Sequence, residues 1–251
     1  MFQGFYNLSS QMLTQTRNLN VISNNMANIS TPGFKSDVLV SGSFQEVLLS
    51  RIGNKEKSPV PVGSMYWVKS ALESVTDYED GALKKTGGSF DFGLEGSGFF
   101  VIQTENGEVY TRDGSFSLDE DGYLILPSVG RVLGVDGEIR FDTDEFSVDT
   151  TGTIYRLEDG SVIGQLRLED FADYGQDLIK SGENVYEAVG AAPLDSQAVV
   201  RWMALEESNV DAAEQMTAMM ESQRALQSAA QVLKMYDKLS EAIVTKLGLS
   251  E

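Results

Sequence analysis

The stretch Leu205–Leu247, LEESNVDAAEQMTAMMESQRALQSAAQVLKMYDKLSEAIVTKL, decides the fold. Its apolar side chains recur at alternating steps of three and four residues, which indicates a long helix that packs along a seam. Ser208 and Asp211 are typical of a helix start, and Gly248 is typical of a helix end. At about 1.5 Å per residue the helix is roughly 55 Å long, so we expect it to need partner helices. The seam comprises Leu205, Ala212, Met216, Met219, Leu226, Ala230, Leu233, Val244 and Leu247, with the polar members Asn209, Gln223, Asp237 and Ser240, beside a second row of Val210, Ala213, Met220, Val232, Leu239 and Ile243.

Residues 1–34 carry a second helical pattern, in which no Asp or Glu occurs. Burying its apolar row yields on the order of 10–20 kcal/mol at most, which is similar to the backbone entropy lost by ordering the segment. The segment is therefore predicted to fray alone and to become ordered when another helix covers it. The row comprises Phe5, Leu8, Met12, Leu19, Ile22, Met26 and Ile29, and the candidates for hydrogen bonds between helices are Asn24, Asn25 and Asn28.

The residues that follow are expected to end this helix and to connect it to the rest of the chain. In the sequence Thr31-Pro32-Gly33-Phe34, the proline restrains the residue before it and the glycine permits a turn. Residues 35–75 are interpreted as a connector. Within it, Phe44–Leu49 is compatible with a helical turn and Gly53–Gly63 with an exposed, extended stretch.

From residue 76 to residue 200 the apolar pattern changes to a period of two. Short β-type runs alternate with the turn dipeptides Asn106-Gly107, Asp113-Gly114, Asp121-Gly122, Asp136-Gly137 and Asp159-Gly160. Asn-Gly and Asp-Gly between such runs are strong hairpin signals. The sequence therefore predicts an α+β fold, in which an antiparallel all-β domain is inserted between long terminal helices. These helices (residues 1–34 and 201–251) are expected to pair in a coiled-coil-like domain.

Composition excludes several classes of function. The formal net charge of -19 argues against binding to nucleic acid or to an anionic membrane, because both would repel the chain. The absence of Cys and His removes the central residue of the commonest zinc sites and of Ser-His and Cys-His catalysis. The longest apolar runs are too short to span a bilayer, and residues 1–10 lack the features of a cleaved secretory signal. We expect no catalytic, cofactor or metal site and no insertion into a membrane.

Two other classes of function compete with a purely structural role. An extracellular wall- or carbohydrate-binding module would need exposed aromatic side chains gathered on one β face. A glycan-cleaving enzyme would need paired carboxylates such as Asp142 and Asp144, although 38 acidic residues make such pairs inevitable. Residues 117–122 are similar to a calcium loop, but Ser117 takes the place of its first Asp, so we expect a plain hairpin there.

Three pairs of stretches resemble the signatures of bacterial flagellar rod and hook proteins. They are Leu19–Asn28 with Ser30–Lys35, Gly96–Val101 with Tyr110–Phe116, and Leu205–Asp211 with Met219–Ala225. They occur in the order of that family and span nearly the whole chain.

The resemblance implies an axial structural subunit without enzymatic activity. Such proteins are exported unfolded through the flagellar export apparatus, without a cleaved signal peptide, and stack helically in the basal body, in the periplasm or across the cell wall. Their terminal helices bundle with those of copies and of other rod and hook proteins, and so line the export channel. The sequence Ser30-Thr31-Pro32-Gly33-Phe34 and the short connector favour the proximal rod over the distal rod.

Overall fold

The computed structural model describes residues 2–51, 60–143, 145–182, 184–190 and 192–248. The chain divides into two compact units. The helical unit consists of Met1–Met26, Asp37–Val75 and Ala212–Glu251, and the β unit consists of Ala27–Ser36 and Thr76–Asp211. Residues 27–36, placed by the sequence in the N-terminal segment and the connector, thus belong to the β unit. The rest of the predicted connector belongs to the helical unit.

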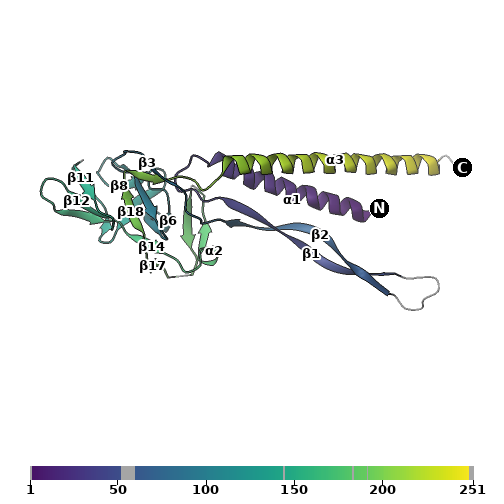
Figure 1. Cartoon of the computed structure of the whole chain (residues 1–251), viewed down its shortest axis with the longest axis horizontal. Helices are drawn as coiled ribbons and strands as arrows, with labels where there is room; N and C mark the ends of the chain where they lie inside the picture. Colours follow the sequence, from purple (N-terminus) through teal and green to yellow (C-terminus); the bar gives the residue numbers. More distant parts are fainter. Residues whose placement is uncertain (1, 52–59, 144, 183, 191, 249–251) are drawn as a thin grey trace. The chain divides into compact units, whose positions relative to one another are not determined.

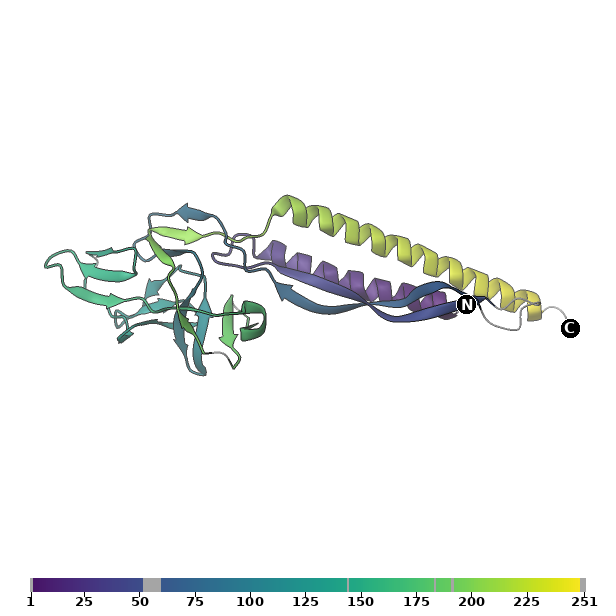
Figure 2. The same ribbon diagram turned by 60° about the horizontal axis from the view of Figure 1, so that its bottom comes forward.

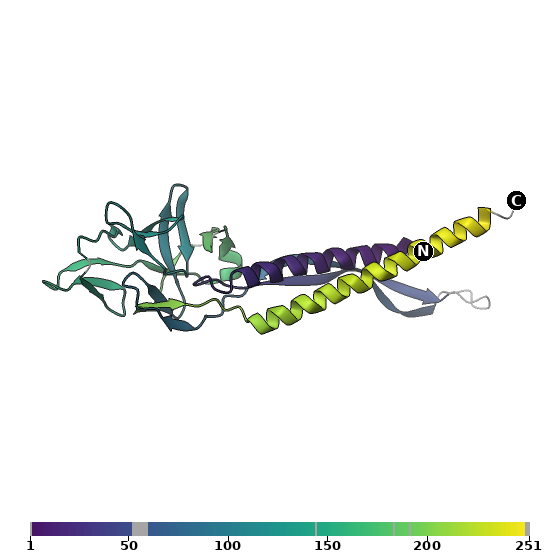
Figure 3. The same cartoon turned by 90° about the horizontal axis from the view of Figure 1, so that it is seen from above.

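The helical unit contains two helices and a two-stranded sheet (Figure 1). The helices are α1 (Phe2–Ala27) and α3 (Ala212–Gly248), and the strands are β1 (Asp37–Arg51) and β2 (Val60–Thr76). Figures 2 and 3 show each helix as one continuous rod and the two strands as a long twisted ribbon. No helix in the described part of the chain is both long enough and apolar enough to cross a membrane.

Three local expectations for these segments were wrong. The N-terminal helix ends at Ala27, seven residues before Phe34, because the following residues bond to the β unit. The helical turn at Phe44–Leu49 is absent, since strand β1 runs through these residues. Helix α3 begins at Ala212, so Ser208 does not cap it. Of the extended stretch Gly53–Gly63, the part up to residue 59 lies outside the described residues, and the remainder is strand β2.

The β unit contains the remaining strands and one short helix, α2 (Tyr174–Asp177). The strands are β3 (Leu83–Lys85), β4 (Phe92–Glu95), β5 (Phe99–Thr104), β6 (Gly107–Thr111), β7 (Ser117–Leu118), β8 (Leu124–Leu126), β9 (Gly130–Gly134), β10 (Gly137–Glu138), β11 (Phe146–Val148), β12 (Thr153–Arg156), β13 (Val162–Gln165), β14 (Leu168–Asp170), β15 (Leu178–Lys180), β16 (Val185–Ala188), β17 (Leu194–Asp195), β18 (Val199–Trp202) and β19 (Ala204–Glu206).

The paired strands described in this unit are antiparallel, which confirms the predicted β domain. The largest sheet follows the order β15-β16-β6-β5-β9-β8-β7, with β14 also beside β5. Four of the predicted hairpin dipeptides do join paired strands: β5 to β6, β7 to β8, β9 to β10 and β12 to β13. Asp113-Gly114 instead joins β6 to β7, which do not pair. There Gly114 lies so close to strand β4 that an added Cβ would be 1.7 Å from the Phe92 carbonyl oxygen.

Strand β5 lies between two hydrophobic clusters and so explains the longest apolar run in the β region. Phe100 and Ile102 belong to the larger cluster, and Phe99 and Val101 belong to the smaller one. Each of these four side chains is at most 1% exposed. A strand covered on both faces is apolar at every position rather than at alternate positions. The β unit therefore has a core of its own.

Candidate assembly site

Two features of the chain are candidates for a role in assembly: the faces of the terminal helices, and the segments by which the β unit connects to them. On α1, the predicted apolar row is partly or fully covered from Leu8 onward, and Ile22 is only 5% exposed. Leu8, Met12, Leu19 and Met26 are half-buried, as is Ile29 just beyond the helix end. The predicted row thus lies on the face of α1 that the helical unit itself covers, and its role as an interface between subunits stays a prediction.

The covered face of α3 departs from the predicted seam at Met216, Gln223 and Asp237, which are exposed, whereas Ala212 and Ala230 are half-buried. Met219, Leu226 and Leu233, one residue per heptad, are half-buried as predicted. Other covered residues of α3 lie one position before the residue that was predicted to be covered. Ser222 is buried, and the predicted Gln223 is exposed. Met216, which was also predicted to be covered, is 55% exposed. The small Ser222 is covered because it faces α1, where Asn18 Nδ2 donates a hydrogen bond of 3.0 Å to its Oγ.

The contact between the two helices is loosely filled. A cavity of about 200 Å³ is lined by Gln11, Met12, Thr14, Gln15, Ser41, Ala225 and Ala229. These residues come from α1, β1 and α3, and most of the side chains are polar or small. A seam of this composition contributes little apolar burial. The pairing of α1 with α3 is therefore short of the close packing of a coiled coil.

Several large apolar side chains of the helical unit remain exposed. On α3 they form two groups at four-residue steps, one near each end of the helix. Every residue described from Asp237 to Ile243 is exposed, so this part of α3 is covered on no side. The exposed apolar residues are Phe5 and Leu13 on α1, Val38 and Val40 on β1, Val75 on β2, and Met216, Met220, Met235, Leu239 and Ile243 on α3.

The asparagines of the N-terminal segment make local contacts. Asn25 is 2% exposed and exchanges two hydrogen bonds with the backbone of Asp37, which fixes the start of β1 beside the end of α1. Asn28 accepts a hydrogen bond from Thr31 Oγ1 at 3.2 Å, and Asn24 is exposed on α1. Asn25 is therefore a residue of the helical unit's own fold.

The segment Thr31–Phe34 is bonded to the β unit. Gly33 has a φ of +63°, and its amide donates to the Glu206 carbonyl at 2.8 Å. The Pro32 carbonyl accepts from Asn184 Nδ2 at 2.8 Å. Phe34 is 3% exposed and lies beneath the ammonium group of Lys180, 4.1 Å from the ring centroid. The residues Pro32, Gly33 and Phe34 thus dock this segment within the β unit, and α1 has already ended at Ala27.

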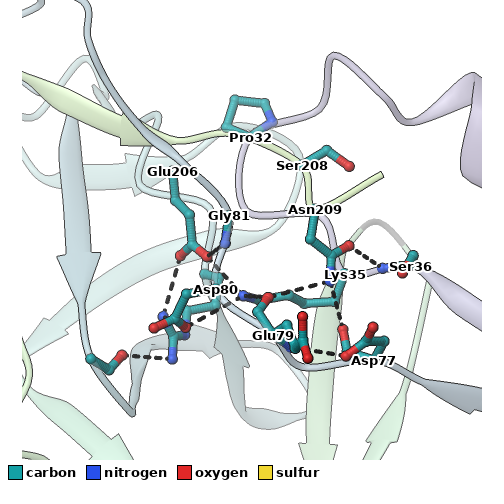
Figure 4. A network of polar contacts seen from close by, with 12 residues as sticks. Pro32, Lys35, Ser36, Asp77, Glu79, Asp80, Gly81, Glu206, Ser208 and Asn209 are labelled. Carbon is teal, nitrogen blue, oxygen red and sulfur yellow. Dashed lines mark hydrogen bonds and ion pairs between the residues drawn. The ribbon is translucent and has the colours of Figure 1, made fainter. Parts of the chain in front are cut away.

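Next to this segment, three charged side chains form a buried ion cluster (Figure 4). Lys35, Arg112 and Glu206 have side chains that are at most 2% exposed. Glu206 Oε1 accepts from Lys35 Nζ at 2.7 Å, and Glu206 Oε2 accepts from Arg112 Nη1 at 3.2 Å. Asp80, which is half-exposed, lies 3.3 Å from Arg112 and 3.7 Å from Lys35. Burial raises the pKa of the neighbouring Asp113 carboxyl above its usual range, and hydrogen bonds from Ser115 oppose that rise.

Asn209 completes the cluster on its other side. Its Oδ1 accepts from the Ser36 amide at 2.7 Å, and its Nδ2 donates to the Asp77 carbonyl at 2.9 Å (Figure 4). Asn209 was predicted on the helical seam, yet it lies in the loop before α3. Leu205 was predicted there too, yet it lies in β19, where it pairs with Lys84 of β3. We call Lys35, Arg112, Glu206, Asn209 and the backbone of residues 77–81 the polar network.

Sequence reasoning missed Lys35, Arg112 and Glu206 as functional candidates. Each occurs in a different one of the three pairs of stretches that carry the family resemblance. A lone charged residue in a motif is usually exposed, and nothing in the pattern revealed that these three would meet.

Net charge is divided unequally between the two units. The helical unit contains nine Lys and Arg against nine Asp and Glu, and the β unit contains ten against 29. The whole net charge of -19 therefore belongs to the β unit. Helical units can approach one another without net repulsion, whereas β units repel each other.

The exposed apolar side chains of α3, with Phe5 and Leu13 of α1 and a β unit that has its own core, define a subunit that assembles with others. Family models match the corresponding parts of the chain. They are described as "Flagella basal body rod protein" for residues 5–35, "Flagellar hook protein FlgE/F/G D1 domain" for residues 93–156, and "Flagellar basal body rod FlgEFG protein C-terminal" for residues 203–246. The chain belongs to the family of flagellar basal-body rod proteins, which are structural proteins and not enzymes.

Individual relatives match nearly the full length of the chain. It is 31% identical over 248 residues to the flagellar basal-body rod protein FlgF of Caulobacter vibrioides, covering 95% of both chains. It is 30% identical over 245 residues to FlgG of Buchnera aphidicola subsp. Schizaphis graminum, covering 91% of this chain and 94% of the relative. It is 28% identical over 267 residues to FlgG of Bacillus subtilis, covering 97% and 98%. Relatives named FlgF and FlgG are thus both among the similar proteins.

Proposed function

We propose that this chain is a structural subunit of the flagellar basal-body rod, in which copies and other rod and hook proteins cover its terminal helices. The observation that carries the proposal is the exposed C-terminal part of α3. Leu239 and Ile243 are 58% and 39% exposed. In a helix turn surrounded by solvent, such apolar side chains contribute no burial energy to the stability of the subunit. Such residues stabilise a helix only when a neighbour buries them.

The sparse contact between α1 and α3 supports the same proposal. Within one chain the helices meet at polar and small residues around Asn18 and Ser222. Coiled-coil-like packing is therefore expected between subunits, where the exposed rows of α1 and α3 can be covered. Bundled helices of this kind would form a tube that contributes to the drive shaft and to the wall of the export channel.

The chemistry of the ends also suits delivery in an unfolded state. The first 34 residues contain no acidic side chain, and the net charge of the helical unit is zero. We propose passage through the flagellar export apparatus without a cleaved signal peptide, followed by assembly in the periplasm or across the cell wall, with a position in the proximal rod. Support for this part comes from the family resemblance.

Leu239→Asp tests the proposed covering of α3. The variant is expected to be a normally folded monomer, because Leu239 is exposed, but to lose incorporation into basal bodies by roughly 100-fold or more. An unpaired carboxylate buried between subunits costs about 3–5 kcal/mol. The measurement is the amount of protein in purified basal bodies from cells that lack the natural chain, together with their motility.

The matched control is Ser228→Asp, which adds the same charge at an exposed polar position of α3 that belongs to neither apolar row. It should assemble close to normally. Leu226→Asp and Met219→Asp should also block assembly, but these half-buried side chains lie on the covered face within the subunit, so they are less specific tests. Normal incorporation of Leu239→Asp would show that no subunit covers this face.

A further inference from the structure

The polar network joins parts of the chain that are remote in sequence. Lys35 and Glu206 are 171 residues apart, and Ser36 and Asn209 are 173 residues apart. Backbone hydrogen bonds join the same two segments: the Gly33 amide donates to the Glu206 carbonyl, and the Asn209 amide donates to the Phe34 carbonyl. The first and last segments of the β unit are thus bonded to each other directly.

One buried carboxylate, that of Glu206, contacts both cations of the network, and the half-exposed Asp80 is a second anion 3.3 Å from Arg112. Glu206 accepts from Lys35, from Arg112 and from the Gly81 amide, which is 2.8 Å from Oε1. Asp80 is half-exposed and its oxygen lies farther from Lys35. Without Glu206, two buried cations would lose their closest anion, and an uncompensated buried charge is strongly unfavourable. A partly formed network is therefore less stable than either a complete network or an open one.

The network borders the smaller hydrophobic cluster but takes no part in the larger one. The Arg112 guanidinium lies over the Phe99 ring, 5.2 Å from its centroid, and Tyr78 of the 77–81 segment packs against the same cluster. As far as the chain is described, the larger cluster contains no side chain of the network. Strands β5 and β6 pair with each other without the 31–36 segment or residues 206–209, so we expect the larger cluster and this pairing to hold while the network is open.

We propose that the polar network is a clasp, which closes as one unit on an already folded β core and ties the two terminal segments of the β unit together. Three of the points where the chain passes between units, after Ser36, before Thr76 and after Asp211, lie within a few residues of it. When the clasp closes, it holds the backbone in place at these three crossing points. Because Glu206 and Asn209 lie at the C-terminal end of the β unit, these crossing points become fixed only after the whole β unit is present.

Hydrogen exchange of the full-length monomer tests the clasp. Two sets of amides are compared: Gly33, Ser36 and Gly81, which donate within the clasp, and the bonded amides of β5 and β6. In the natural chain we expect the clasp amides to exchange roughly tenfold faster or more than the β5 and β6 amides, through a local opening. In Glu206→Gln the clasp amides should lose nearly all protection, while β5 and β6 stay protected.

Two further variants sharpen the result. Asn209→Ala removes only uncharged hydrogen bonds and leaves Glu206 in place, yet Gly33 and Gly81 should lose protection with Ser36, because the clasp opens as a unit. Glu207→Gln is the control, since Glu207 is half-exposed and pairs with the exposed Lys84. It should leave all rates within about twofold. Equal rates for clasp and core amides in every variant would overturn the proposal, as would loss of protection at Ser36 alone in Asn209→Ala.

Discussion

Gly33→Ala is expected to lower the free energy of unfolding of the β unit by about 2–5 kcal/mol. Part of the loss comes from the left-handed backbone of Gly33, with φ +63°, which costs a residue with a side chain about 1–2 kcal/mol. The remainder comes from close approach, because an added Cβ would lie 2.3 Å from the Arg112 carbonyl carbon and 2.6 Å from the Asp113 amide nitrogen. Backbone atoms cannot move aside without straining the fold, and overpacking of this kind lowers the free energy of unfolding by about 1–3 kcal/mol. Urea unfolding followed by near-ultraviolet circular dichroism measures the change.

Gly182→Ala separates these two causes. Gly182 has almost the same φ, +60°, but an added Cβ there meets nothing within 4 Å. It should therefore cost only the conformational part, about 1–2 kcal/mol. If Gly33→Ala is no more damaging than Gly182→Ala, the tight docking of the 31–36 segment on the β unit is not a significant source of stability.

Deleting residues 1–26 is expected to abolish incorporation into the rod and motility, and this is the largest functional effect that we predict. The deletion removes α1 from the helical unit and exposes the face of α3 around Ser222, whose partner Asn18 is lost. It spares residues 27–36, since these belong to the β unit. A deletion of residues 1–34 would instead remove Gly33 and Phe34 and so damage both units.

The β unit is the internal control for this deletion. Its near-ultraviolet circular dichroism and its unfolding midpoint should remain close to those of the natural chain, because its hydrophobic clusters contain no residue of α1. The readout is the protein content of basal bodies and swimming in cells that lack the natural chain. Restored motility would show that α1 is dispensable for assembly.

The elements of this fold were largely predictable because local chemistry determines them. The three–four spacing located both helices, and the Asn-Gly and Asp-Gly dipeptides located four hairpins. Asp113-Gly114 failed as a hairpin signal because tertiary contact with Phe92 determines its conformation. The ribbon of β1 and β2 was missed because eight residues without an Asn-Gly or Asp-Gly dipeptide separate its two strands in the sequence.

The candidate site was predicted less completely, since it depends on long-range contacts. Leu205 and Asn209 continue the helical spacing in sequence, but strand pairing with Lys84 and hydrogen bonds to Ser36 and Asp77 prevail over that spacing. On α3, Met216 is more apolar than its neighbours, yet the helix faces α1 with Ser222 and Ala229, which a hydrophobicity pattern cannot favour. The meeting of Lys35 with Glu206 could not be inferred from spacing at all.

The central claim is that the terminal helices are completed only by neighbouring subunits. Hydrogen exchange of the α3 peptide from Met235 to Ile243 tests it most directly, measured in dilute monomer and in purified basal bodies. We expect rapid exchange in the monomer, because this part of α3 is uncovered, and exchange roughly 100-fold slower or more in the rod. Slow exchange already in the monomer, or equally fast exchange in the assembled rod, would contradict the account.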